Sequence, residues 1–210
     1  MMEDAKKLST EEQILEAAEK VFLEKGFKNS KISNIAELAG VNNALINYYF
    51  RSKENLFDKV LRSKVGLLAH SLSHVADREI PFEELLKNVI ETQFDFFKNN
   101  DSLPRFLITE ILTDSSQMNM FREDIVPIII KAGMHLNDKL QQEIAAGNIR
   151  NLSMFELLYL ITAVNVFCFI VKPIVVGVEE GVTALFLEAM EDRKKKNAEI
   201  VMSYLKNISK

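Results

Sequence analysis

Apolar residues recur every three or four positions along most of the chain, which is the period of an amphipathic α-helix. In the stretch STEEQILEAAEKVFLEKG, residues 9–26, Ser9 and Glu12 stand at the spacing of a capping box. Gly26 is a natural stop at the other end. We therefore expect a first helix here, with one buried stripe made of Ile14, Ala17, Ala18, Val21 and Phe22.

Polar caps and a glycine mark a second, shorter helix. It lies within KISNIAELAG, residues 31–40, and ends at Gly40, with Ser30 or Ser33 as its cap. The connection over residues 39–42 has the length of the turn in a helix-turn-helix.

A third helix follows that turn, and a longer fourth helix follows the third. The third can begin at Asn42 or Asn43 and run to about Tyr49. Ser52 is the expected cap of the fourth, whose inward positions are Leu56, Phe57, Val60 and Leu61. Three short helices and then a long one therefore occupy the N-terminal part of the chain.

Longer helical patterns fill the rest of the chain. One starts at Pro81, and the others cover about residues 102–114, 120–146 (bent near Pro127), 153–171 and 185–207. No alternation of β-branched and polar residues between turn signals indicates a sheet. The sequence therefore predicts an all-α protein, with a three-helix helix-turn-helix domain over residues 1–66 and a larger helical domain over residues 67–210.

The segment 153–171 is apolar on nearly all sides, so we expect it to be buried on nearly all sides. Its uncharged run Leu157–Val171 is 15 residues long and contains Asn165. Lys172-Pro173 then interrupts it, whereas a membrane span needs about 20 apolar residues. A buried helix is therefore preferred to a transmembrane one.

Composition supports a helical protein of the cytoplasm. With 7 Gly and 4 Pro in 210 residues, the chain has few turn formers. Its single cysteine, Cys168, excludes an internal disulfide and suits a reducing compartment. Residues 1–10 are polar and charged, so no signal peptide is expected there.

Charge is unevenly distributed along the chain. The net charge is −4, but residues 25–66 hold eight Lys or Arg against three acids, whereas residues 67–210 are net acidic. A basic segment on an acidic body suggests a polyanionic partner for the basic segment alone.

The stretch GVNNALINYYFRSKENLF, residues 40–57, places hydrogen-bonding and aromatic groups on the third helix. If Gly40 and Val41 form the turn, Ile46, Tyr49 and Phe50 lie nearer the core. The outer side then carries Asn43, Ala44, Asn47 and Tyr48.

These outward groups suit DNA. Asparagine can bind an adenine edge through two hydrogen bonds, and a small residue such as Ala44 lets the helix approach the groove floor. Tyrosine hydroxyls and Lys53, in the first turn of the next helix, can bind phosphates. The alternative is a solvated polar helix face with tyrosines in the core.

The stretch from Thr10 to Leu61 resembles the N-terminal domain of the TetR family of bacterial transcriptional regulators. The matching elements are Ile14-Leu15, Ala17-Ala18, Phe22, Gly26-Phe27, Ile35-Ala36, Gly40-Val41, Tyr49-Phe50, Ser52-Lys53-Glu54 and Leu56-Phe57. Asn42, Ala44 and Asn47 stand where the family usually has Ser, Gly and Tyr. The operator sequence therefore cannot be borrowed from a relative.

The resemblance implies DNA contacts for specific residues. Those expected to bind the DNA backbone are Lys31, Asn42, Tyr49 and Lys53. Those expected to read bases are Asn43, Ala44 and Asn47. Tyr48 is expected to contact the DNA backbone and to share in base reading.

The resemblance also implies that the remainder of the chain is a ligand-binding and dimerisation domain. The last two helices, 153–171 and 185–207, would form a four-helix bundle with those of a second copy. The alternative for residues 153–171 is a central core helix of one chain.

Bulky apolar residues in the second domain are candidates to line a pocket for an apolar or amphipathic small molecule, although a core position is the preferred interpretation for each one taken singly. They are Phe94, Phe97, Phe106, Met118, Phe121, Met134, Tyr159 and Phe167.

No cofactor, metal site or catalytic residue is expected. His70 and His74 have the i, i+4 spacing of metal ligands, but no cysteine or carboxylate pair accompanies them, so surface histidines are preferred. Cys168 is interpreted as buried filler. The sequence contains no phosphate-binding loop and no nucleophile elbow.

We therefore expect a homodimeric repressor that a small effector releases from a palindromic operator. The alternative is a helical small-molecule-binding protein with a vestigial DNA-binding head. An enzyme on the same scaffold would need a catalytic cluster. Activation in place of repression stays open.

Overall fold

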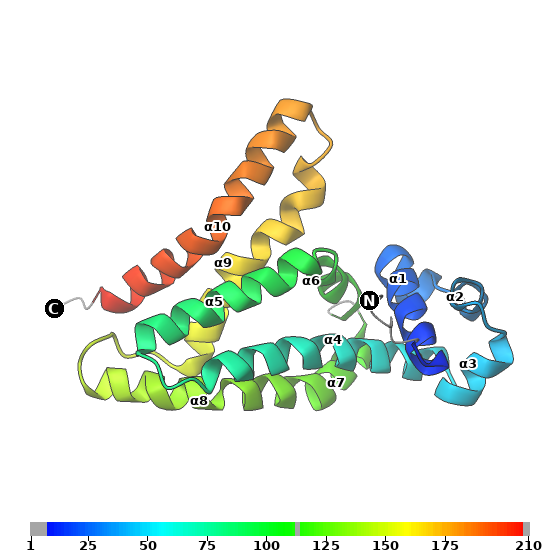
Figure 1. Ribbon diagram of the computed structural model, residues 1–210, viewed down its shortest axis with the longest axis horizontal. Coiled ribbons are helices and arrows are strands. Elements are labelled where there is room, and N and C mark those ends of the chain that lie inside the picture. Colours follow the sequence, from blue (N-terminus) through cyan, green and yellow to red (C-terminus); the bar gives the residue numbers. More distant parts are fainter. Residues whose placement is uncertain (1–7, 112–113, 208–210) are drawn as a thin grey trace, which may run out of the picture. The chain divides into compact units, whose positions relative to one another are not determined.

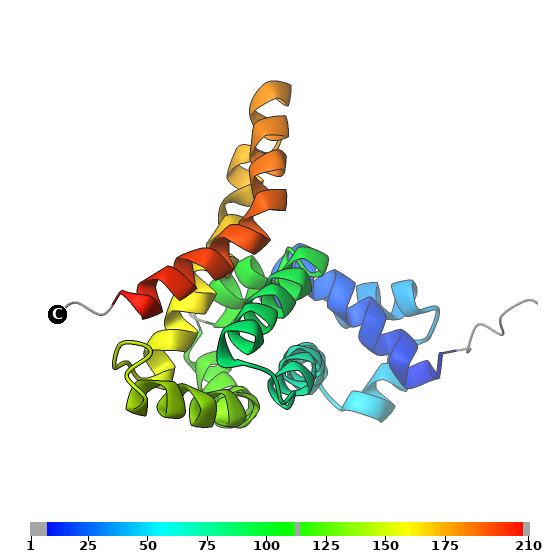
Figure 2. The same ribbon diagram turned by 60° about the vertical axis from the view of Figure 1, so that its left-hand side comes forward.

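The computed structural model of the chain describes residues 8–111 and 114–207, and every regular element in these ranges is a helix (Figures 1 and 2). The prediction of an all-α protein is thereby confirmed.

The chain divides into two compact units. The first is Met1–Val65 together with Phe106–Asp124, and the second is Gly66–Arg105 together with Ile125–Lys210. Residues 106–124, which the sequence analysis assigned to the second domain, thus group with the N-terminal helices.

The N-terminal helices of the first unit begin where their caps indicate. Helix α1 spans Thr10–Asn29, and its cap Ser9 forms both hydrogen bonds of a capping box with Glu12. Gly26, with φ 74° and ψ 165°, interrupts the helical conformation at the expected stop, and a short turn after it continues to Asn29. The core of this unit contains the buried rings of Phe22 and Phe57, which meet edge to face at 5.3 Å between centroids.

Three further helices complete the N-terminal part. Helix α2 spans Ile32–Ala39, α3 spans Asn43–Phe50 and α4 spans Lys53–Ala76. Ser30 does not cap α2; its hydroxyl instead donates to the Val21 and Gly26 carbonyls of α1. The side chain of Ser52 accepts from the Asn55 backbone N–H at the start of α4, as expected.

The segment between residues 103 and 125 is less regular than the sequence suggests. It consists of a short α6 (Leu103–Phe106), the π-helix η1 (Leu107–Ile111), α7 (Ser115–Met120) and the π-helix η2 (Phe121–Ile125). The sequence analysis expected one helix over residues 102–114. π-Helical turns are rare and often occur at functional sites.

The helices of the second unit are longer. They are α5 (Phe82–Asn99), α8 (Val126–Ala145), α9 (Met154–Val175) and α10 (Glu180–Lys206), together with the second part of α4. Helix α9 runs through Pro173, which stands in its last turns, and α10 begins five residues before the expected Leu185. Their apolar faces share one core that includes Leu85, Leu86, Ile90, Leu140, Leu157, Ile161, Val201 and Leu205.

A buried amide network ties three of these helices together. Asn165 of α9 is fully buried and donates to the Ile90 carbonyl (2.9 Å) and the Gln93 side chain (3.0 Å) of α5. Asn197 of α10 donates to the Asn165 side-chain oxygen at 2.9 Å. A shift of α9 along its neighbours would leave these amides unpaired, so the network fixes the register of the three helices.

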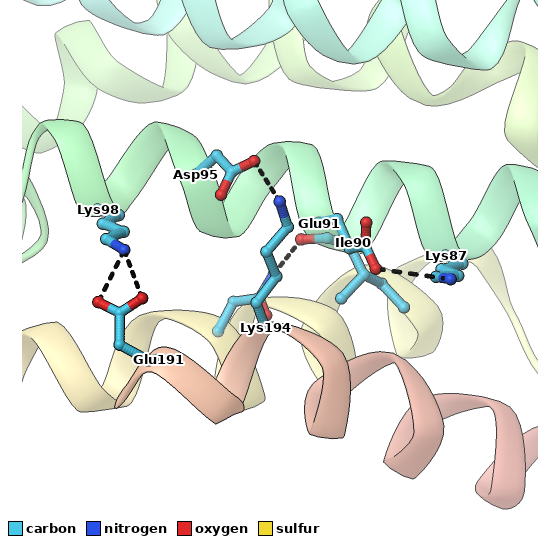
Figure 3. Close-up of polar contacts among 8 residues, drawn as sticks. Lys87, Ile90, Glu91, Asp95, Lys98, Glu191 and Lys194 are labelled. Carbon is cyan, nitrogen blue, oxygen red and sulfur yellow. Dashed lines mark hydrogen bonds and ion pairs between the residues drawn. The ribbon is translucent and has the colours of Figure 1, made fainter. Parts of the chain in front are cut away.

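Ion pairs line the surface where α5 and α10 meet (Figure 3). Lys98 pairs with Glu191 at 2.8 Å, and Lys194 pairs with Asp95 at 2.6 Å. Such exposed pairs stabilise a fold by roughly 0.2–1 kcal/mol each. They orient the two helices more than they stabilise them.

The expectation that residues 153–171 are buried on nearly all sides is wrong for the single chain. Phe155, Tyr159 and Phe167 of α9 are between 65% and 77% exposed. Helix α9 is also long and apolar enough to cross a membrane by length and composition, and 22% of that window is buried. The chain alone therefore leaves much of this apolar helix uncovered.

Candidate nucleic-acid interface

A glycine turn joins α2 to α3. Gly40 adopts the left-handed conformation with φ 67°, which carries little strain only for glycine. The Val41 N–H donates to the Ala36 carbonyl at 3.0 Å, closing the end of α2. The Asn42 side-chain oxygen then accepts from the Leu45 N–H at 2.9 Å, so Asn42 is the cap of α3.

Helix α3 has a buried side and an exposed side. Ile46 and Phe50 are 1% and 6% exposed and hold the helix against the core of its unit. The four predicted base-reading residues share the other side: Asn43, Ala44, Asn47 and Tyr48 are all exposed. The structure thus brings these four residues together on one outward face.

Tyr49 lies further out than expected. It is 42% exposed, and its ring meets that of Tyr48 edge to face at 5.4 Å between centroids. Both hydroxyl-bearing rings therefore lie at the accessible end of α3.

The proposed phosphate-binding residues differ in how many of their hydrogen-bonding groups already form contacts within the protein. Lys31 is exposed at the start of α2. Asn42 uses its side-chain oxygen in the cap, and an amide in that position still offers two N–H donors.

Lys53 already forms contacts within the protein. Its ammonium donates to the Phe27 carbonyl (2.9 Å) and the Ser30 carbonyl (3.1 Å), and it lies 4.3 Å from the centroid of the Phe27 ring. A lysine has three donors, so one N–H is left for a phosphate.

A residue distant in sequence also contacts the backbone near the end of α1, at Gly26 and Phe27. The Glu110 carboxylate, in η1, accepts from the Phe27 N–H at 2.8 Å. A Cβ on Gly26 would lie 2.5 Å from the same carboxylate, so a larger residue there would displace the carboxylate from this position. No local pattern in the sequence indicates this contact, because 83 residues separate the partners.

The sequence analysis also did not identify Arg51 as a candidate site residue. It ends α3 with φ 67° and ψ −41°, a conformation that L-residues rarely adopt, while its N–H donates to the Asn47 carbonyl at 3.0 Å. Strained backbone of this kind is concentrated at functional sites.

Ion pairs within the first unit reduce the number of free basic groups. Lys64 pairs with Glu19 at 2.7 Å, and Arg62 pairs with Asp58 at 2.9 Å and with Asp124. In the described part of the chain, no acidic residue forms an ion pair with Lys31 or Arg51. Lys31 at the start of α2 and Arg51 at the end of α3 thus stay available to an anionic partner.

The candidate pocket residues are divided between the two units. Phe106, Met118 and Phe121 belong to the first unit, and the other five belong to the second. Of those five, Phe94 and Phe97 are buried in the core, whereas Met134, Tyr159 and Phe167 are exposed on the single chain. Phe94 also lines a hollow of about 80 Å³ beside Met190.

The described residues contain no group of three side chains that could hold a metal ion, and His70 and His74 are both exposed on α4. Cys168 is buried, as expected, and donates to the Asn165 carbonyl at 3.2 Å. Burial raises the pKa of its thiol, which keeps it protonated and unreactive.

Comparison with known proteins points to one family. Residues 14–60 match the family model "Bacterial regulatory proteins, tetR family". The "Fatty acid metabolism regulator protein" of Bacillus subtilis is 27% identical over 139 residues, which are 66% of this chain and 70% of that protein. The "HTH-type transcriptional repressor NicS" of Pseudomonas putida is 32% identical over 103 residues, about half of each chain.

Solved structures share the fold. The transcriptional regulator FadR from Bacillus subtilis, solved in complex with stearoyl-CoA, matches with a TM-score of 0.63 at 23% identity, covering 87% of this chain and 96% of that one. HlyIIR, a hemolysin II transcriptional regulator, matches with a TM-score of 0.64 at 24% identity, covering 94% and 97%.

Proposed function

We propose that this chain, which belongs to the TetR family of bacterial regulatory proteins, is a homodimeric repressor released from a palindromic operator by a small apolar or amphipathic effector. Regulators of this family bind DNA, and its members are not enzymes. The repressor role, the dimer and the effector are our proposals. So is a cytoplasmic location.

The observation that carries the proposal is the outward face of α3. Asn43, Ala44, Asn47 and Tyr48 offer amide groups, a small residue and a phenol at positions that can reach base edges in a major groove. Lys31 and Arg51 can bind phosphates on either side. Lys53 and Asn42 each retain a donor for the same purpose.

The uncovered face of α9 supports a dimer. Phe155, Tyr159 and Phe167 on α9 and Leu185 on α10 form an apolar surface that a second copy can cover. A two-fold axis through this surface would repeat α3 on the DNA. Half-sites about 34–36 Å apart would then be bound together.

The relatives suggest which effectors to test first. The solved FadR of Bacillus subtilis carries stearoyl-CoA, an amphipathic molecule with an anionic head and a long apolar chain. Fatty acids and acyl thioesters are therefore our first candidates for this chain.

The decisive experiment is fluorescence anisotropy with DNA from upstream of the protein's own gene, titrated from low to physiological salt. Asn47→Ala should lose preference for the operator over scrambled DNA by about 1–3 kcal/mol per half-site. Lys31→Ala should lower the salt slope by about 0.9 for each lost phosphate contact, hence by about 2 in a dimer.

Lys196→Ala is the matched control, because Lys196 is an exposed lysine of α10 in the second unit. Its salt slope should equal that of the wild type. Uniformly weak binding by all four proteins, repeated in a selection from random DNA, would favour the alternative of a vestigial head on a small-molecule-binding protein.

A further inference from the structure

A groove of about 380 Å³ lies between α4 and α8 within the second unit. Helix α4 lines it with Gly66, Ala69, His70 and Ser73, and Asp77 follows just beyond the end of the helix. Helix α8 lines it with Ile128, Lys131, Ala132 and His135. The volume lies near the lower end of the roughly 300–1,000 Å³ typical of small-molecule sites.

Small residues keep this groove open. Gly66, Ala69 and Ala132 stand where larger side chains would let the two helices interlock. A Cβ built on Gly66 would have no neighbour within 4 Å. Together with Ile128 these residues give the groove an apolar floor.

One polar atom on the groove has no partner in the described chain. The Nε2 atom of His135 is buried from solvent and forms no hydrogen bond with any described residue. An imidazole nitrogen must donate or accept a hydrogen bond, and burying one without a partner is unfavourable. A bound molecule with a hydrogen-bonding group would supply the partner.

The hydrogen-bond donors around the floor suit an anion. The groove is lined by the Lys131 ammonium, the His70 and His135 imidazoles and the Ser73 hydroxyl, against a single carboxylate, Asp77. We propose that this groove binds the carboxylate or phosphate head of a small amphipathic molecule, with its apolar body on the Gly66–Ala132 floor. The binding site itself does not depend on the proposed function, and the inference rests on that function only where it identifies the bound molecule as the effector.

Histidine NMR on the full-length protein tests the site without reference to DNA. The chain has three histidines, and His74 lies on α4 outside the groove, so it is an internal reference. Benzoate and phenyl phosphate at millimolar concentrations should shift the ring signals of His70 and His135 in a saturable manner. The His74 signal should stay in place, and benzyl alcohol, the matched neutral probe, should bind at least about tenfold more weakly.

Two variants separate the groove from the rest of the fold. Ala132→Leu should fill the groove and abolish the shifts, whereas Ala145→Leu, at an exposed position on the same helix, should leave them unchanged. Lys131→Gln removes the charge of the side chain but keeps it polar, and should weaken phenyl phosphate binding by about tenfold. Circular dichroism of each variant verifies that the helices are intact.

The outcomes also distinguish this inference from the proposed function. No saturable shift with either anion, or equal shifts of His74, would overturn the groove site even if operator DNA binds tightly. Saturable shifts in a protein that binds no DNA would support the site and refute the repressor. Retained binding by Ala132→Leu would place the anions elsewhere and also overturn the inference.

Discussion

At the end of α1, two backbone carbonyls lack the partners that a continuing helix would provide, and the ammonium of Lys53 takes that place. The C-terminal end of a helix carries partial negative charge, so a cation is favoured there. The same side chain sits at the start of α4, beside the predicted DNA-binding surface. One residue can thus support both the local fold and a phosphate contact.

We predict that Lys53→Met lowers the free energy of unfolding by about 1–2 kcal/mol, because it keeps the apolar stem but removes the side-chain donor of the Ser30 carbonyl and leaves the Phe27 carbonyl with only the Ser30 N–H. Urea denaturation followed by circular dichroism measures this. Lys59→Met is the control on the same helix, since Lys59 is exposed and forms only a 4.0 Å ion pair. Equal midpoints for the two variants would contradict a structural role for Lys53.

Residue-scale prediction from the sequence was accurate where the signal is local. The capping box at Ser9 and the cap at Asn42 depend on positions three residues apart, and both exist in the structure. The position of Lys53 in a first turn indicated an anion contact. Its two carbonyl acceptors lie 23 and 26 residues away, and no periodicity reveals them.

At the scale of elements, η1 is the segment whose placement matters most for the DNA-binding surface. It brings Glu110 to the kink at Gly26, where the carboxylate completes the turn that leads into α2. The sequence predicted an ordinary helix here because the apolar spacing of residues 102–114 suits one. A π-helical turn differs by a single hydrogen-bond offset, which residue spacing does not encode.

We predict that Glu110→Ala speeds amide hydrogen exchange at Phe27 by about tenfold or more, because that N–H loses its part-buried acceptor. Glu110→Gln should have a smaller effect, since its carbonyl oxygen can still accept. Glu123→Ala, an exposed acidic position in η2, controls for the loss of charge in the same segment. Unchanged exchange in Glu110→Ala would show that the contact contributes nothing to the turn.

At the scale of the whole molecule, the main feature is the apolar surface of α9 and α10, which one chain alone leaves exposed to solvent. Sequence analysis identified both helices and their apolar character, but it left open whether the cover of residues 153–171 comes from the same chain or from a second copy. Hydropathy reports how apolar a helix is, and it cannot report whether its cover comes from the same chain. The buried Asn165 network shows that one side of α9 does have partners within the chain.

We predict that Tyr159→Glu converts the dimer to monomers and weakens operator binding by about a hundredfold or more, because each half-site then binds alone. Size-exclusion chromatography with light scattering measures the mass. Ile130→Glu is the matched control, since Ile130 is an exposed apolar residue of α8 outside the proposed dimer surface. A Tyr159→Glu protein that stays dimeric would locate the interface elsewhere.

The two-part composition of the first unit has a consequence for how such proteins can be recombined. Exchanging only the first 65 residues with those of a relative would separate Gly26 from the Glu110 that fits beside it. Chimeras that transplant residues 106–124 together with the N-terminal helices keep that pair intact. An exchange of this unit between relatives therefore requires that both of its segments, residues 1–65 and 106–124, be exchanged together.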